Sequence, residues 1–299
     1  MCMSATGDTA ALLQYFAPFD PKLVELPGQK GQLSVRYLTD VEKKDDSDWS
    51  RSAMRLILEI VKDPKHLARG DILLFCPGEA EIRQIEDDLA TVRKIEPTLM
   101  QYIDTLTLYR DLPAHEQAHA LQDRYSTVTE EDGRQRKVRW RKVILATNIA
   151  ETSITFPRLD WVFDCGMEKV MSYNAEFGAS ELLMRPCGKS QSQQRAGRTG
   201  RTRPGTAIRL YSKAHYEARP DHPEPPILRM DLSPMLLLLW DHGIADAGPD
   251  HLDWPSEFES DSCRSQLIRS ATNNRAACSW LRSSHSARFR PGSSVDRDG

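Results

Sequence analysis

Apolar residues recur along the chain with two different periods, and each period predicts one type of secondary structure. Over Trp49–Val61 they recur at helical spacing, which predicts a core-facing helix. A longer amphipathic pattern after Pro77 and Gly78 predicts a second helix. Short apolar or alternating runs predict strands, and the most apolar of them have the pattern of strands buried in a parallel sheet. These runs are Asp71–Cys76, Asp104–Tyr109, Lys142–Ala146, Leu159–Asp164 and Gly205–Ser212.

Weaker patterns predict the elements between these runs. Met1–Pro18 contains a short helical pattern, and Val24–Leu38 contains a Pro-Gly turn followed by a strand. Pro113 opens a further helix. The charged segment Ser126–Arg141 predicts a solvated loop or hairpin, with a phosphate-contacting patch as the alternative. Val170–Pro186 predicts a hairpin, and the sequence alone does not decide whether it is an ordinary edge hairpin or one with a functional role.

The last part of the chain loses this regularity. Ile227–Gly243 is an amphipathic pattern that ends at a glycine, which is typical of a helix. From Ser256 the sequence is rich in serine and arginine, contains no lysine and has no clear period. Such a segment buries little apolar area, so we predict disorder there. Out-of-frame or mis-spliced translation would explain the abrupt change, and a basic RNA-binding tail is the alternative.

The bulk composition is that of an ordinary soluble globular protein. The chain has 299 residues, of which 39% are hydrophobic and 28% charged, and its net charge is −3. Nucleic-acid contacts therefore have to come from local patches. The six cysteines form no CxxC pair, so we expect no metal site, no disulfide framework and a reducing intracellular compartment, nuclear or cytoplasmic. The longest apolar run, Met235–Trp240, is far too short to cross a membrane, and no secretory signal is visible.

One string of arginines and glycines stands apart from this background. Residues 194–201 read QRAGRTGR, so Arg195, Arg198 and Arg201 recur every third residue. Residues three apart share one face of a helical turn, and glycine leaves room for a bulky anion to approach. Two guanidiniums on one face suit a polyphosphate because each is a planar and permanently charged donor. The alternative is a solvated basic helix.

This string resembles motif VI of superfamily 2 helicases, and two further strings agree with it. VILATNIAETSIT, Val143–Thr155, is similar to motif V of the DEAH/RHA group, and Ser4-Ala5-Thr6 is similar to motif III. The resemblance extends from about Met3 to about Trp254. It implies an α/β fold of the second RecA-like helicase domain: a parallel β-sheet flanked by helices, of the P-loop NTPase type. A short helical segment and the disordered tail would follow.

The resemblance also assigns roles in ATP hydrolysis. Gln194 would orient the attacking water or the γ-phosphate, while Arg198 and Arg201 would be arginine fingers that stabilise the transferring charge. Arg195 would contribute to the nucleotide site by holding the motif in place through internal or interdomain pairing. Thr155 is expected near the nucleotide, and Leu121 stands where the family has a phenylalanine that stacks on adenine.

A second group of residues is expected to contact RNA or to couple the two activities. By resemblance, Thr147 and Asn148 would face the RNA backbone, with Thr152 and Ser153 in the same loop. Small polar residues after a strand of a parallel sheet let a backbone approach phosphates. Ser4, Ala5 and Thr6 would form the coupling motif between ATP hydrolysis and strand separation. The family has an aspartate where this chain has Pro157, so one expected sugar contact is replaced.

The nucleotide-binding half of such a helicase is not visible in the sequence. Gly188-Lys189-Ser190 resembles the end of a phosphate-binding loop, but the required first glycine would be Leu183, so we reject it. We expect ATP with Mg²⁺ to need a first RecA-like domain, and we expect the chain alone to hydrolyse ATP negligibly. Expected partners are RNA or possibly DNA, the missing domain and an activating protein, with no membrane. The alternative is a non-catalytic RNA- or protein-binding module.

The resemblance divides the chain into four parts. Residues 1–45 would be the motif III remnant and linker, and residues 46–218 the RecA-like domain. Residues 219–255 would begin a winged-helix region, and residues 256–299 would be the disordered or aberrant tail.

Overall fold

A computed structural model describes residues 9–24, 32–38, 48–63, 70–129, 134–151, 154–174, 177–201, 203–226, 229–231, 234 and 238. The chain splits into two compact units, residues 1–170 with 184–223, and residues 171–183 with 224–299. Ser4–Thr6, Thr152–Ser153, the tail and most of the predicted helix Ile227–Gly243 lie outside the described residues.

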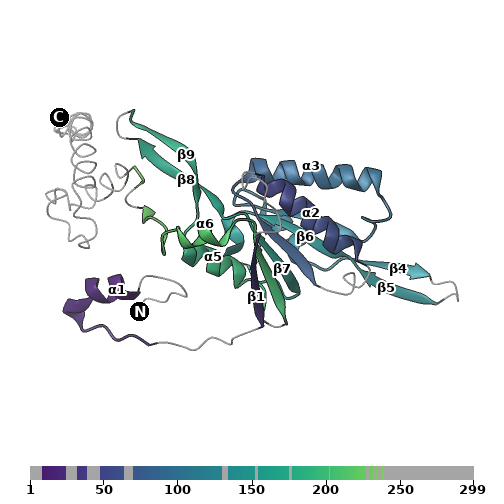
Figure 1. Ribbon diagram of the computed structural model, residues 1–299, viewed down its shortest axis with the longest axis horizontal. Helices are drawn as coiled ribbons and strands as arrows, with labels where there is room; N and C mark the ends of the chain where they lie inside the picture. Colours follow the sequence, from purple (N-terminus) through teal and green to yellow (C-terminus); the bar gives the residue numbers. More distant parts are fainter. Residues whose placement is uncertain are drawn as a thin grey trace, which may run out of the picture. The chain divides into compact units, whose positions relative to one another are not determined.

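A six-stranded, all-parallel sheet forms the centre of the first unit, as the sequence predicts (Figure 1). The strand order is β1-β10-β7-β2-β6-β3, so strands far apart in the sequence become neighbours. The strands are β1 (Leu33–Tyr37), β2 (Asp71–Phe75), β3 (Ile103–Leu108), β6 (Arg141–Ala146), β7 (Leu159–Asp164) and β10 (Gly205–Arg209). Every residue of β2 and β6 is buried, which explains their almost unbroken apolar runs.

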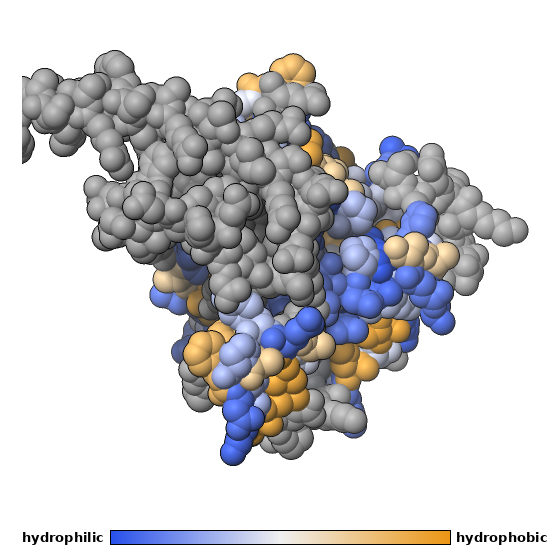
Figure 2. All heavy atoms as spheres, turned by 90° about the vertical axis from the view of Figure 1, so that its left-hand side faces the viewer, coloured by the Kyte–Doolittle hydropathy of each residue, from blue (hydrophilic) through white to orange (hydrophobic). Residues whose placement is uncertain are grey.

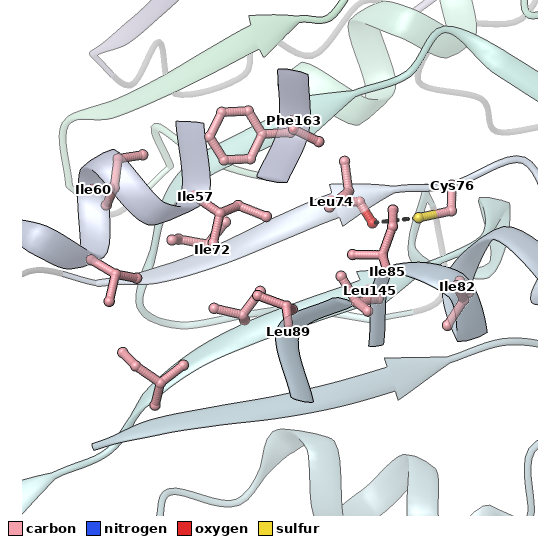
Figure 3. Packing of buried hydrophobic residues seen from close by; sticks show 14 of the residues in the cluster. Ile57, Ile60, Ile72, Leu74, Cys76, Ile82, Ile85, Leu89, Leu145 and Phe163 are labelled. Carbon is pink, nitrogen blue, oxygen red and sulfur yellow. Dashed lines mark hydrogen bonds between the residues drawn. The ribbon is translucent and has the colours of Figure 1, made fainter. Parts of the chain in front are cut away.

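Two long helices cover one face of this sheet. They are α2 (Trp49–Lys62), which begins at the Asp48 cap, and α3 (Glu79–Ile95). Figure 3 shows their buried side chains packed against those of the strands. The contacting residues include Ile57, Ile60, Ile82, Ile85 and Leu89 from the helices, with Ile72, Leu74, Leu145 and Phe163 from the sheet. Both helices confirm the periodicity of the sequence.

Shorter elements cover the opposite face. They are α4 (Ala114–Leu121), the 3₁₀ helix η3 (Asn148–Glu151) and α5 (Lys189–Ala196). A second apolar cluster joins this layer to the sheet, with Ala150 and Ala196 packed beside Leu73, Phe75 and Val162. Since these helices have at most 8 residues, compared with 14 in α2 and 17 in α3, the sheet is covered more thinly on this side.

Two β-hairpins stand outside the main sheet, and both confirm predictions. β4 (Tyr125–Thr129) and β5 (Gln135–Arg139) pair antiparallel within the charged segment. The Arg139 guanidinium fixes this hairpin to the sheet through two hydrogen bonds of 2.8 and 2.7 Å to the carboxylate of Asp71. β8 (Met167–Asn174) and β9 (Ala179–Pro186) form the second hairpin.

The remaining elements are short. They are α1 (Thr9–Tyr15), η1 (Ala17–Phe19) and α6 (Lys213–Glu217). Strand β1 pairs with β10, so the RecA-like sheet includes residues that precede the predicted domain boundary at residue 46. Several large apolar side chains remain exposed in the described residues, among them Phe19, Met171, Phe177 and Leu182. The described surface in Figure 2 accordingly mixes hydrophobic and hydrophilic residues.

Candidate functional site

The loop after β6 lies at the carboxyl edge of the sheet, as predicted for residues that meet a phosphate backbone. Thr147 follows Ala146 directly, and its amide donates to the Leu108 carbonyl at 3.0 Å. Asn148 is exposed and Thr147 is half-buried. On the other side, the Cys76 amide donates to the Ala146 carbonyl at 2.7 Å, so loops from three adjacent strands meet here.

The arginine string occupies the thinner face and does not form one helix. α5 ends at Ala196, and the amides of Arg198 and Thr199 then bond carbonyls only three residues back. Arg198 and Arg201 therefore lie beyond α5, in the turn that follows it, and that they point the same way stays a prediction. The turn continues to Gly200, whose φ of 76° and close approach to Leu33 suit glycine alone. A 2.6 Å hydrogen bond from the Thr199 hydroxyl to the Leu159 carbonyl fixes the turn to β7.

Arg195 is the buried centre of the site. Its side chain has no solvent exposure, and its Nε donates to Glu151 Oε1 at 2.7 Å while its Nη1 donates to Asp164 Oδ1 at 2.8 Å. The same Nη1 lies 3.2 Å from the Met167 carbonyl, and the guanidinium carbon lies 5.1 Å from the Phe75 ring centroid. Arg195 thus joins α5 to η3 and to the carboxyl end of β7.

Asp164 is shared between this arginine and a second set of donors. The Gly166 amide donates to its Oδ1 at 2.8 Å, and the Tyr211 hydroxyl lies 3.0 Å from its Oδ2. The same hydroxyl lies 3.0 Å from Ser192 Oγ on α5. Both carboxylate oxygens of Asp164 are therefore satisfied, which a buried charge requires.

The pKa values of Asp164, Glu151 and Arg195 show how burial and opposite charges act on these three buried groups. Burial acts to raise the pKa of Asp164, but Arg195, the Gly166 amide and the Tyr211 hydroxyl together hold it below its ordinary value. Burial raises the pKa of Glu151, and the attraction of Arg195 only partly opposes this. Burial acts to lower the pKa of Arg195, yet the surrounding groups, Asp164 foremost, hold it well above its ordinary value. The arginine stays charged.

Arg198 and Arg201 are the accessible arginines of the string. Arg198 is half-buried, with Nη1 donating to the Ile154 carbonyl at 3.3 Å and Nε to the Gln194 carbonyl at 3.5 Å. Arg201 is exposed, with Nε donating to the Gly197 carbonyl at 2.8 Å. Burial and the positive charge of Arg201 lower the pKa of Arg198. Each side chain is thus steadied by a carbonyl four residues back and keeps donors free for an anion.

The other predicted residues are spread over the same layer. Gln194 is half-buried on α5, and Thr155 is exposed in the segment between η3 and β7. Leu121 is 42% exposed at the end of α4. Ser4, Ala5, Thr6, Thr152 and Ser153 lie outside the described residues. The nucleotide contact expected of Arg195 stays a prediction, and its complete burial means that it acts here on Glu151 and Asp164.

Three cysteines lie close to the Arg195 guanidinium, and their thiols interact with its charge. Cys76, Cys165 and Cys187 are buried free thiols. Burial is the largest cause of a raised pKa at each, and it raises the pKa of Cys165 to about 12. They are therefore neutral thiols that fill space around the ion pair.

Neither a metal cluster nor a membrane span is found in the described part of the chain. Among these residues no three His, Cys, Asp or Glu side chains gather in a way that could hold a metal ion. None of their helices is long and apolar enough to cross a membrane.

Comparison with known proteins decides the family. The model of the helicase conserved C-terminal domain matches residues 52–203, which is more than half of the chain. The chain belongs to this family. The match contains most of α2, Arg195 with its partners Glu151 and Asp164, and the whole arginine string, so the helicase C-terminal domain and the RecA-like unit largely coincide.

Similar curated proteins are DEAH-box RNA helicases of much greater length. The chain is 31% identical over 243 residues to the ATP-dependent RNA helicase HrpA of Escherichia coli, covering 81% of this chain and 17% of HrpA. It is 33% identical over 255 residues to the pre-mRNA-splicing factor ATP-dependent RNA helicase DEAH10 of Arabidopsis thaliana, covering 85% of this chain and 33% of DEAH10. The chain thus spans between a sixth and a third of these relatives.

A solved structure supports the fold. The crystal structure of the Escherichia coli DEAH/RHA helicase HrpB is similar with a TM-score of 0.65 and 28% sequence identity, over 89% of this chain and 30% of that one. This likeness agrees with the RecA-like parallel sheet. The chain therefore contains a helicase conserved C-terminal domain that is similar to the corresponding part of DEAH-box RNA helicases.

The sequence did not single out the residues that hold Arg195. Glu151 lies in the string Val143–Thr155 without a predicted role of its own, whereas the structure buries it in an ion pair. The sequence predicts Asp164 only as the end of a strand and Tyr211 as part of another, whereas the structure places both beside Ser192 or Arg195 of α5. A signal for Asp164 existed, because an acidic residue closing a buried apolar strand requires a partner.

Proposed function

We propose that the chain acts as the second RecA-like domain of an ATP-dependent RNA helicase. In this proposal Arg198 and Arg201 are the arginine fingers, and Gln194 orients the attacking water or the γ-phosphate. The observation that carries the proposal is the difference in burial between the three arginines of the string. Arg195 is fully buried on two carboxylates, while Arg198 and Arg201 remain accessible on the thinly covered face.

The mechanism follows from charge and placement. The transferring phosphoryl group carries negative charge in the transition state, and a guanidinium offers it a planar fork of permanently charged donors. The carbonyls of Gln194 and Gly197 limit the motion of these guanidiniums, so less entropy is lost when they meet the phosphate. Thr147 and Asn148 would bind the RNA backbone at the carboxyl edge, and movement between domains would carry the protein 3′ to 5′ along RNA.

ATP and Mg²⁺ are expected to be held mainly by a first RecA-like domain. Mg²⁺ would neutralise the phosphate charge when bound, and its ligands would come from that domain. Leu121 and Thr155 would contribute from this chain, Leu121 by covering the adenine without aromatic stacking. An activating protein and an intracellular location, in the nucleus or cytoplasm, belong to the same proposal.

The decisive experiment joins this chain to the first RecA-like domain of HrpB and measures RNA-stimulated ATP hydrolysis. Arg198→Ala and Arg201→Ala should each lower kcat by on the order of 10³-fold, with a smaller change in KM, because the fingers act on the transition state. An inactive wild-type fusion would count against the proposal.

Arg203→Ala is the matched control. Arg203 is a neighbouring, partly exposed arginine, but its Nε pairs with Asp160 Oδ1 at 3.0 Å and it has no assigned role in hydrolysis. The control should keep its ATPase rate. An equal loss in all three variants would mean that general positive charge, and no finger function, supports the rate.

A further inference from the structure

A hydrogen-bonded turn lies beside the RNA-facing loop at the carboxyl edge of the sheet. It follows β3, and the Leu112 amide closes it by donating to the Tyr109 carbonyl at 3.2 Å. The side-chain amide of Gln117 donates to the Leu112 carbonyl at 2.8 Å and steadies the turn from α4. Arg110 and Asp111 occupy its tip, and both are exposed.

The strand register places this turn next to Thr147 and Asn148. In the parallel pair β3–β6, Leu108 is the partner of Ala146, so the two strands end at the same level. Arg110 lies two residues beyond Leu108, and Asn148 lies two residues beyond Ala146. Neighbouring strands are about 4.8 Å apart, and the 3.0 Å hydrogen bond from the Thr147 amide to the Leu108 carbonyl keeps the loops together.

Arg110 differs from two nearby cations, Arg83 and Lys169, in having no acidic partner among the described residues. Arg83 on α3 pairs with Glu79, and Lys169 on β8 lies 2.8 Å from Glu81. Within the described residues, no carboxylate oxygen lies within 4.0 Å of the Arg110 guanidinium. A positive charge held on a rigid turn, with its donors unoccupied, is suited to an anion.

We infer that Arg110 is an additional contact to the RNA backbone, beside Thr147 and Asn148. The inference rests on the proposed function, since it extends the RNA-binding edge across β3. A guanidinium there would bind a phosphate oxygen without reading the base, so the contact adds affinity and salt dependence for any sequence. Asp111, at the same tip, opposes the phosphate charge and limits the gain.

The test uses the full chain and a fluorescently labelled 12-nucleotide oligouridine, with the Kd measured by anisotropy over a range of salt concentrations. Arg110→Ala should weaken binding and reduce the slope of log K against log salt by about 0.7, the value for one phosphate contact to a single strand. Arg110→Lys should keep the slope. A wild-type slope in Arg110→Ala overturns the inference.

Two control variants separate this contact from general effects of charge and folding. Arg36→Ala removes an exposed arginine from β1. This strand and β3 are the two outermost strands of the sheet, so the variant should leave both Kd and slope unchanged. Asp111→Asn changes the same turn but removes the opposing charge, so it should bind RNA equally or more tightly. A loss of binding in either control as large as that of Arg110→Ala overturns the inference.

The outcomes also separate the two proposals. If the unmodified chain binds no RNA, the proposed function fails together with the inference. If it binds and the Thr147→Ala, Asn148→Ala double variant weakens binding while Arg110→Ala does not, only the inference about Arg110 fails.

Discussion

Arg195 is expected to contribute more to the free energy of unfolding than any other residue of the site. Removing its side chain would leave Glu151 and Asp164 buried without a cationic partner. Loss of one partner of a buried ion pair costs about 3–5 kcal/mol, so Arg195→Ala should lower the free energy of unfolding by about that amount in urea denaturation. Arg201→Ala, which removes an exposed side chain whose Nε donates to the Gly197 carbonyl, should cost less than about 1 kcal/mol. An equal loss of unfolding free energy in the two variants would contradict the larger structural role of Arg195.

Asp164 should give the protein a measurable dependence on pH. Its pKa in the folded state lies below the ordinary value of 3.8, so its stabilising contribution is present above that value and is lost as the pH falls through the lower folded value. The stability difference between wild type and Asp164→Asn should therefore be constant from about pH 7 to about pH 5 and shrink below about pH 4. Urea denaturation at several pH values measures this stability difference. A difference that grows on acidification would contradict a lowered pKa of Asp164 in the folded state.

The turn at the end of the arginine string, after α5, depends on glycine. A Cβ on Gly200 would lie 3.0 Å from Leu33 Cβ, and its φ is 76°. Gly200→Ala should cost about 1–3 kcal/mol in free energy of unfolding, because it adds crowding to an unfavourable backbone conformation. Gly178 has a similar φ of 62° in the turn of its hairpin with nothing within 4 Å, so Gly178→Ala isolates the backbone part and should cost less.

The β4–β5 hairpin should detach independently of the sheet. Arg139 holds it through Asp71 and through a 2.7 Å hydrogen bond to Asp123. In Arg139→Ala, hydrogen exchange should accelerate over residues 125–139 while β6 and β2 keep their protection. Lys137→Ala, an exposed change on the same strand, serves as the control. Faster exchange throughout the sheet would mean that the hairpin and the core unfold together.

Sequence patterns predict most of the helices and strands, because burial of one face makes apolar residues recur with the period of a helix or a strand. The apolar runs of β2 and β6 and the helical spacing of α2 report which sides face the core. The end of α5 was not predictable, because the turn at Arg198–Gly200 depends on contacts with Leu159 and Leu33, far away in sequence. The pairing of Arg195 with Asp164, 31 residues apart, depends likewise on strand order, which periodicity does not encode.

ATP hydrolysis should require a second domain in addition to this chain. The chain alone should show negligible RNA-stimulated ATPase activity, because arginine fingers need a bound triphosphate on which to act. Release of phosphate from purified chain, measured with and without RNA, tests this. The Arg198→Ala variant should have the same background rate as wild type. Turnover by the chain alone that disappears in Arg198→Ala would contradict the requirement.

The three buried thiols around Arg195 provide a chemical reporter of this junction. Cys76, Cys165 and Cys187 are shielded from solvent and protonated at neutral pH, so an alkylating reagent should modify them only when the packing between α5 and the sheet opens. Their labelling rate, followed by mass spectrometry, therefore measures how often the junction opens. The same labelling would show whether binding of nucleotide or RNA at the surface tightens a region that neither ligand touches.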